Sequence, residues 1–181
     1  MRRLPISIAV GITLLLCTSP VLRGDADHGA AAERAYAYGS GPRHRLVAYR
    51  DQNPAGGPAG TADPDARRPG VVILHGGFWF GDQPAGWNLG AQRIADSGAV
   101  VFDVDYRRNV DAAWPAQRSD VLRALRWIRG RADIFGVDPD RLVLLGSSAG
   151  GHLATAVGTY GAGRQRVAGV VGLSPVADPY R

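Results

Sequence analysis

Cysteine is nearly absent from this sequence of 181 residues, and its only copy, Cys17, lies near the N-terminus. An internal disulfide framework and a cysteine metal site are therefore excluded, and the folded part must rely on a hydrophobic core. Long hydrophobic runs are lacking as well. The longest, residues 6–17, has 12 residues and is short for a membrane span, so we expect no stable membrane span.

Charge is not concentrated in any one region either. Lysine and arginine together number 21 against 16 acidic residues, a net charge of +5, but they are scattered and form no stripe interleaved with aromatics. This distribution is typical of a solvated surface, and we expect no nucleic-acid partner. No motif indicates a metal or a cofactor, and we predict none. No oligomeric state is predicted.

The first 26 residues have the layout of a secretory signal peptide. Two arginines precede the apolar run, and small residues follow it, with Gly24-Asp25-Ala26 as the best cleavage pattern. Cleavage would remove three arginines and one aspartate, lower the net charge from +5 to +3, and place the protein in a periplasmic or extracellular compartment. An uncleaved membrane anchor is the alternative. A lipoprotein is disfavoured because Leu16 before Cys17 is bulky.

Residues 27–42 are rich in alanine and glycine without periodicity, which predicts a flexible leader. Ordered structure is expected over residues 43–181. Residues 44–50 alternate polar and apolar side chains, which predicts a half-exposed strand near a sheet edge. Residues 52–70 consist mostly of small, proline and charged residues and predict a long surface loop.

Four apolar runs predict buried strands, at residues 71–74, 99–106, 142–145 and 167–173. Helical patterns separate them, at residues 88–97, 115–135 and 149 to about 160, while residues 137–140 form a turn. Gly98 and Gly136 are placed to end the first two helices. This alternation predicts an α/β fold, a mostly parallel sheet with helices on both faces, whose ligands gather at the carboxyl ends of the strands.

The last of these strand-to-helix connections contains Gly146-Ser147-Ser148-Ala149-Gly150, a GxSxG pattern. A nucleophile on so sharp a turn needs neighbours without side-chain bulk, which glycine provides. Ser148 would present its hydroxyl at a helix N-terminus, where backbone N–H groups favour developing negative charge. A flexible loop is the alternative for the bare pattern, and the flanking strand and helix favour the turn.

Three blocks together resemble the α/β-hydrolases, of the esterase and lipase type related to hormone-sensitive lipase. They are His75-Gly76-Gly77-Phe78-Trp79, Asp105-Tyr106-Arg107 and residues 146–152, and Trp114-Pro115-Ala116-Gln117 and Asp120-Val121 also fit the pattern. The resemblance is greatest to carboxylesterases and arylformamidases with an HGG-x-W loop. It covers roughly residues 44–178.

The resemblance implies a role for each block. Ser148 would be the acylated nucleophile, and the backbone N–H groups of Gly77, Phe78 and Ala149 would form the oxyanion hole. His75 and Gly76 would support the loop. Several relatives carry a glycine where Phe78 stands. The oxyanion hole needs only the backbone N–H of this residue, so the Phe78 side chain is expected to change the shape of the acyl pocket and not the chemistry. The implied substrate is a small-molecule carboxylic ester, with arylformamidase-like amide hydrolysis as the alternative.

Other residues near these blocks are interpreted as structural. His152 lies one helical turn after Ser148 and is expected on a helix face or in the core. Trp79 is expected to pack under the loop, and little mechanistic consequence is expected from Ser147.

The acid and the base of a catalytic triad are lacking. In this fold an acid and then a histidine follow the serine, yet the residues after Ser148 hold one acid, Asp178, and one histidine, His152, which precedes it. Asp178 comes a strand too early and is interpreted as structural. The remaining histidines, His28 and His44 besides His75, lie upstream.

We therefore expect an α/β-hydrolase domain, over residues 43–181, that lacks its last strands and helices and has little or no turnover. Residues 167–173 would then form an edge strand with apolar faces on both sides, an aggregation hazard. The alternative function is a catalytically dead α/β-hydrolase module that binds small molecules or a partner.

Overall fold

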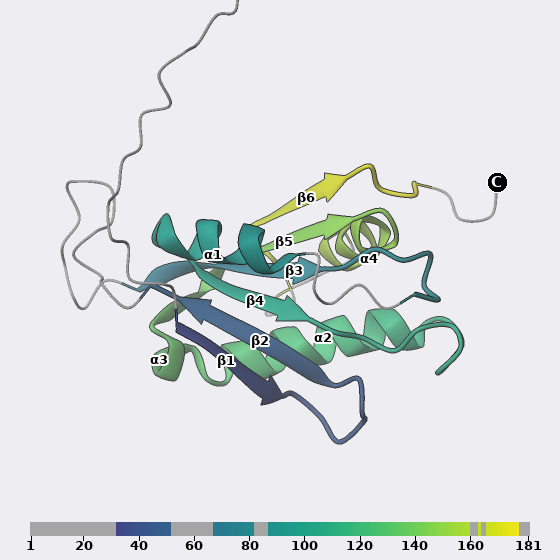
Figure 1. Cartoon of the computed structure of the whole chain (residues 1–181), viewed down its shortest axis with the longest axis horizontal. Coiled ribbons are helices and arrows are strands. Elements are labelled where there is room, and N and C mark those ends of the chain that lie inside the picture. The colour runs from purple at the N-terminus through teal and green to yellow at the C-terminus, as the bar shows by residue number, and fades with distance from the viewer. Residues whose placement is uncertain (1–31, 52–66, 82–86, 160–162, 164–165, 178–181) are drawn as a thin grey trace, which may run out of the picture.

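A six-stranded sheet forms the centre of the computed structural model, which describes residues 32–51, 67–81, 87–159, 163 and 166–177 (Figure 1). The strands are β1 (Ala32–Ala37), β2 (Arg45–Arg50), β3 (Arg68–Leu74), β4 (Val100–Val104), β5 (Val137–Ser147) and β6 (Gly169–Leu173), in the spatial order β1-β2-β4-β3-β5-β6. β2 is antiparallel to β1 and to β4, whereas β4, β3, β5 and β6 run parallel to one another.

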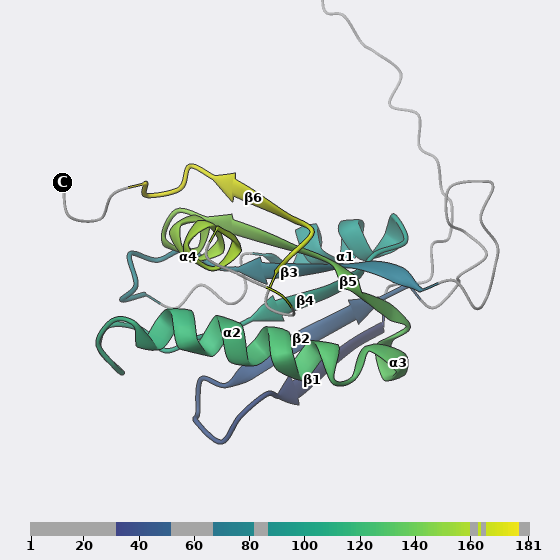
Figure 2. The same cartoon turned by 180° about the vertical axis from the view of Figure 1, so that it is seen from behind.

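Helices cover both faces of this sheet. They are α1 (Asn88–Asp96), α2 (Ala116–Arg129), α3 (Ala132–Phe135) and α4 (Ala149–Gly158). Figure 2 shows α2, α3 and α4 in front of the sheet, with α1 on the opposite face. The predicted α/β class, with a mostly parallel sheet and helices on both faces, is confirmed. No helix within the described residues is long and apolar enough to cross a membrane.

The two faces carry separate hydrophobic cores because side chains alternate along each strand. On β4, Phe102 points into the large core under α2, α3 and α4, where Leu125 and Leu153 also lie. Val101 points into a small core under α1, together with Ile73.

The prediction of a flexible leader over residues 27–42 was wrong for its described part. Residues 32–37 form β1, which pairs with β2 along its whole length. Aromatic side chains anchor this region: the ring of Tyr36 lies 5.3 Å from that of Phe135, and the buried Tyr38 donates a hydrogen bond from its hydroxyl to the Asp105 carbonyl oxygen at 2.6 Å. β1 therefore takes the sheet edge, and β2 lies one strand inside it. The predicted signal peptide, residues 1–26, lies outside the described residues.

The helix predicted over residues 115–135 is interrupted. α2 ends at Gly130, and α3 follows as a single turn. Gly136 ends α3 with a φ of 63°, and Gly98 follows α1 with a φ of 98°, as their placement in the sequence indicates. Residues 137–140, expected as a turn, instead extend β5.

The strand at the other edge, β6, is open on its outer side within the described residues. Val170, Val171 and Leu173 are 37%, 45% and 44% exposed, as the prediction of an apolar edge strand requires.

Candidate active site

Ser148 occupies the turn between β5 and α4, with a φ of 52° and a ψ of −117°. Residues with a side chain rarely adopt this backbone conformation, which marks a strained position. The flanking glycines are required by close packing. A Cβ atom on Gly146 would lie 2.1 Å from the Gly150 carbonyl oxygen, and one on Gly150 would lie 2.1 Å from the Leu74 carbonyl oxygen. The strand, sharp turn and helix expected from GxSxG are therefore present.

The loop after β3 has an unusual backbone. Gly77, Phe78 and Trp79 have φ values of 116°, 53° and 63°, three consecutive residues in the positive region. The N–H groups of Phe80 and Gly81 donate to the Gly77 carbonyl oxygen at 2.9 and 2.8 Å and close the turn. The Phe78 side chain points outward and is 75% exposed.

This loop lies directly against the Ser148 turn. A Cβ atom on Gly76 would lie 3.1 Å from the Ser147 carbonyl oxygen and 3.4 Å from Cβ of Ser148. The structure thus brings together two blocks that are about 70 residues apart in the sequence, at the carboxyl ends of the adjacent parallel strands β3 and β5.

His75 begins the loop and is buried, with 2% of its surface exposed. Its Nδ1 lies 2.7 Å from the Gly76 carbonyl oxygen and its Nε2 lies 3.4 Å from Oδ1 of Asp105. Both partners are acceptors, so the ring can make both bonds only as the imidazolium. Burial lowers the pKa of His75, but the hydrogen bonds to Asp105 and Gly76 and the nearby carboxylates outweigh burial and raise the pKa overall.

Tyr106 fixes the other side of His75. The two rings stack at 4.4 Å between centroids with 9° between their planes, and the Tyr106 hydroxyl donates to the His75 carbonyl oxygen at 2.7 Å. Both the side chain and the backbone of His75 are therefore held in place.

An ion pair with a buried carboxylate, between Arg107 and Asp120, lies near this region. Asp120 is fully buried and accepts hydrogen bonds from Nε and Nη2 of Arg107 at 2.8 and 2.7 Å, while Nε2 of His44 lies 3.0 Å from its Oδ1. Burial would raise the pKa of Asp120, but the hydrogen bonds from Arg107 outweigh it and lower the pKa. Nothing in the sequence near His44 indicates that it belongs to this group.

His152 lies on α4 between two tryptophan rings. The centroids of Trp79 and Trp114 are each 5.5 Å from the His152 ring. Its Nδ1 is buried without a hydrogen-bond partner among the described residues, and burial lowers the pKa of His152. These contacts agree with the helix-face position expected for His152 and with the packing role expected for Trp79.

Within the described residues, no acid and base are assembled next to Ser148. Both ring nitrogens of His75 are engaged, and no hydrogen bond joins the Ser148 hydroxyl to a described side chain. Asp178 lies outside the described residues. The described part also holds no group of three or more histidine, cysteine or acidic residues that could bind a metal ion.

Comparison with known proteins agrees with these features. The BD-FAE family model matches residues 61–171, more than half of the chain. Esterase LipQ of Mycobacterium tuberculosis is 32% identical over 127 residues, which make up 63% of this chain and 30% of LipQ. Arylacetamide deacetylase of Oryctolagus cuniculus is 41% identical over 96 residues, 50% of this chain and 24% of that protein. The chain thus spans a third or less of these curated relatives.

Solved structures show the same fold. Esterase B from Lactobacillus rhamnosis has a TM-score of 0.67 at 30% identity, over 84% of this chain and 50% of that one. The α/β-hydrolase MGS-M1 from a deep-sea metagenome library has a TM-score of 0.66 at 24% identity, over 81% of this chain and 57% of that one. The chain therefore belongs to the BD-FAE family and is an α/β-hydrolase of the esterase type related to hormone-sensitive lipase.

Proposed function

We propose that this chain carries the nucleophile and the oxyanion hole of a serine hydrolase that acts on carboxylic esters. The observation that carries the proposal is the strained backbone of Ser148, held at the strand–helix turn with Gly76 packed against it. Strain of this kind persists only where the surroundings impose it, and it exposes the hydroxyl. The names of the relatives, esterase and deacetylase, support the same reaction type.

In the proposed reaction, Oγ of Ser148 forms a bond to the substrate carbonyl carbon, and the carbonyl π electrons move to oxygen. The N–H groups of Ala149, Gly77 and Phe78 stabilise that oxyanion. Supporting this role, the N–H groups of Gly77 and Phe78 donate to no other residue in the described part of the chain. The bond between the carbonyl carbon and the alkoxy oxygen then breaks as the carbonyl re-forms, and the serine proton passes through solvent to the departing alkoxy oxygen. The products are the acyl-serine and the free alcohol.

The serine proton needs an acceptor, and His75 is not suited to that task. Its Nδ1 lies against the Gly76 carbonyl oxygen and its Nε2 against the Asp105 carboxylate, and within the described residues no hydrogen bond joins its ring to Ser148. His75 instead fixes the loop that carries Gly77. We therefore propose that this chain reacts once with activated reagents and turns over little or not at all, because an unassisted serine hydroxyl is a poor nucleophile at neutral pH.

A small or medium acyl ester is the proposed substrate. Aryl amide hydrolysis is the second candidate, favoured by the 41% identity to arylacetamide deacetylase.

Export through residues 1–26 is also a proposal, based on their sequence. The mass of the protein recovered from the periplasm or the medium tests it, and an intact N-terminus on exported protein would contradict cleavage.

Labelling with a fluorophosphonate tests the nucleophile. We expect slow, stoichiometric modification of the wild-type chain that Ser148→Ala abolishes. Ser147→Ala is the matched control, because it removes the neighbouring hydroxyl, and it should leave labelling intact. Labelling that survives in Ser148→Ala would contradict the assignment, and an unreactive wild-type chain would favour the binding module.

Hydrolysis of p-nitrophenyl acetate tests turnover separately. We expect at most a stoichiometric release of p-nitrophenol. Sustained release that Ser148→Ala abolishes would refute the prediction of little turnover while supporting Ser148 as the nucleophile.

A further inference from the structure

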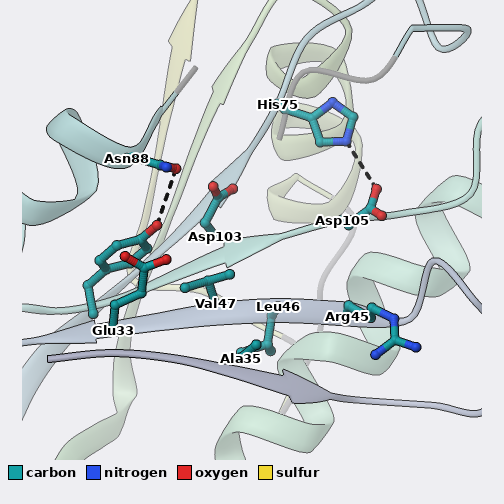
Figure 3. Close-up of a pocket in the computed structure, with 10 residues that line it drawn as sticks. Glu33, Ala35, Arg45, Leu46, Val47, His75, Asn88, Asp103 and Asp105 are labelled. Atoms are coloured by element: carbon teal, nitrogen blue, oxygen red, sulfur yellow. Dashed lines mark hydrogen bonds and ion pairs between the residues drawn. The ribbon is translucent and has the colours of Figure 1, made fainter. Parts of the chain in front are cut away.

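A pocket lies on the α1 face of the sheet, next to His75. Its volume is about 360 Å³, and β1, β2 and β4 form its floor (Figure 3). Ala35, Val47 and Asp103 are register partners on adjacent strands and lie in one row across that floor. Asn88 at the start of α1 and His75 at the end of β3 close two of its sides.

Asp103 is the unusual member of this row. It is 7% exposed, its carboxylate points into the pocket (Figure 3), and it makes no hydrogen bond or ion pair with another described residue. Burial raises the pKa of Asp103 to about 7, with the charge of His75 opposing and that of Asp105 adding to the rise. A buried ionised carboxylate is stable only when it is paired, and the described residues supply no direct partner.

The rest of the lining is acidic and apolar. Glu33 and Asp105 add two carboxylates, and Val47, Ala35 and the Tyr49 ring add apolar surface. Two cationic groups also line the pocket: His75 lies 3.4 Å from Asp105, and the exposed Arg45 donates from Nε to the Pro42 carbonyl oxygen at 3.2 Å. The three carboxylates of the lining outnumber them. The pocket therefore favours a small cation that carries an alkyl chain.

The lining residues favour an organic ammonium over a metal ion. The described residues contain no cluster that could hold a metal ion. A primary ammonium offers three N–H donors to Asp103 and its neighbours, and a cation is attracted to the face of an aromatic ring such as Tyr49. The sequence of 181 residues contains no lysine, so none of its own side chains can supply this group.

We propose that this pocket binds a primary alkylammonium group, from a free amine or from a lysine side chain of another polypeptide, with Asp103 as the carboxylate that receives it. The site does not use Ser148, so it stands apart from the proposed hydrolase function.

Titration of the full chain with n-butylammonium at pH 8, followed by calorimetry or amide NMR shifts, tests the proposal. We expect saturable binding, and none of the neutral analogue n-butanol. Asp103→Asn should weaken binding about tenfold or more, because it removes a charge-assisted hydrogen bond. Asp96→Asn is the matched control, since it changes an exposed aspartate at the end of α1, and it should bind as the wild type does.

A second variant leaves Asp103 in place. Ala35→Phe fills the pocket from the exposed edge strand, where a larger side chain can be accommodated, and should also abolish binding. Nα-acetyl-lysine-N-methylamide distinguishes the two sources of the ammonium. Binding of this compound alone would indicate a lysine side chain, and binding of n-butylammonium would indicate that a free amine suffices.

Binding should also strengthen from pH 6 to pH 8 as Asp103 ionises, and Asp103→Asn should reduce this dependence to the part that comes from the loss of positive charge on His75. The titratable and polar groups that face Asp103 are His75, Asp105, Glu33, Arg45, Tyr49 and Asn88. Absence of saturable binding by both ammonium probes, or equal binding by the wild type and Asp103→Asn, would overturn the proposal.

Discussion

The two faces of the sheet differ in whether their buried carboxylates have hydrogen-bond partners. On the face covered by α2, α3 and α4, a fully buried carboxylate, Asp120, meets Arg107 and His44 at hydrogen-bond distance. On the α1 face, the nearly buried carboxylate of Asp103 lines a pocket and makes no hydrogen bond or ion pair with another described residue. The ionised carboxylate of Asp120 is thus stabilised and that of Asp103 destabilised, because Arg107 and His44 pair with Asp120 and no described side chain pairs with Asp103.

Side chains of β4 and of Asp105, the residue after it, alternate between the two faces. Val100, Phe102 and Val104 belong to the large core, whereas Asp103 and Asp105 face the pocket. One strand can therefore contribute apolar side chains to the core on one face and polar side chains to a pocket on the other face. On the α1 face, Val101 belongs to the small core, and the aspartates that follow it at every second position mark where the pocket begins.

Asp120→Ala should have the largest effect on the free energy of unfolding, because it removes the buried carboxylate on the face covered by α2, α3 and α4. Removal of one partner leaves Arg107 without its buried carboxylate, and we expect unfolding to become easier by about 3–5 kcal/mol. Urea unfolding followed by circular dichroism measures this. Asp133→Ala is the matched control, because Asp133 pairs with Arg67 while the two side chains are 83% and 49% exposed, and should cost under about 1 kcal/mol. Similar losses in the two variants would contradict the contrast between buried and exposed pairs.

Asp103→Asn should have the next largest effect, in the opposite direction. The pKa of Asp103 rises from 3.8 to about 7 on folding. The wild type therefore loses stability as the pH rises from about 4 to about 7, because the unfolded chain ionises first. At pH 8 the variant should be more stable by up to roughly 4 kcal/mol, and near pH 4 the two proteins should converge.

Thermal or urea unfolding at pH 4, 6 and 8 measures this difference. A constant difference at all three values would mean that packing, not ionisation, separates Asp103→Asn from the wild type. A less stable variant at pH 8 would show that Asp103 has a partner that compensates its charge.

The Ser148 turn and the loop after β3 could be predicted from the sequence because the residues that indicate them lie close together in the chain. Gly146, Ser148 and Gly150 lie within five residues, and the turn itself forbids side chains at the glycines. The same holds for Gly76 and Gly77, whose backbone geometry determines the residue type. The fold class followed from apolar runs separated by helical patterns, which are equally local.

The remaining features depend on contacts between distant residues. His44 and Asp120 are 76 positions apart, and nothing near either residue indicates the other. β1 was missed because Ala32–Ala37 is mostly exposed, and its strand conformation depends on pairing with β2. Asp103 was included in a buried run, since its unpaired state is visible only when the neighbouring strands and α1 are in place.

The smallest expected effect concerns His75, which lies between the pocket and the loop. Its pKa is raised on folding, so its stabilising contribution is complete below the unfolded value of 6.5 and is lost as the pH rises through the folded value. In the Asp103→Asn background, stability should therefore still fall above pH 6.5, by at most about 1 kcal/mol, the size of a partly exposed ion pair. His75→Gln added to that background should remove the fall. His152 is present in both proteins, so its own titration cancels in the difference. An unchanged slope after His75→Gln would mean that His75 does not cause the fall and is neutral in the folded protein.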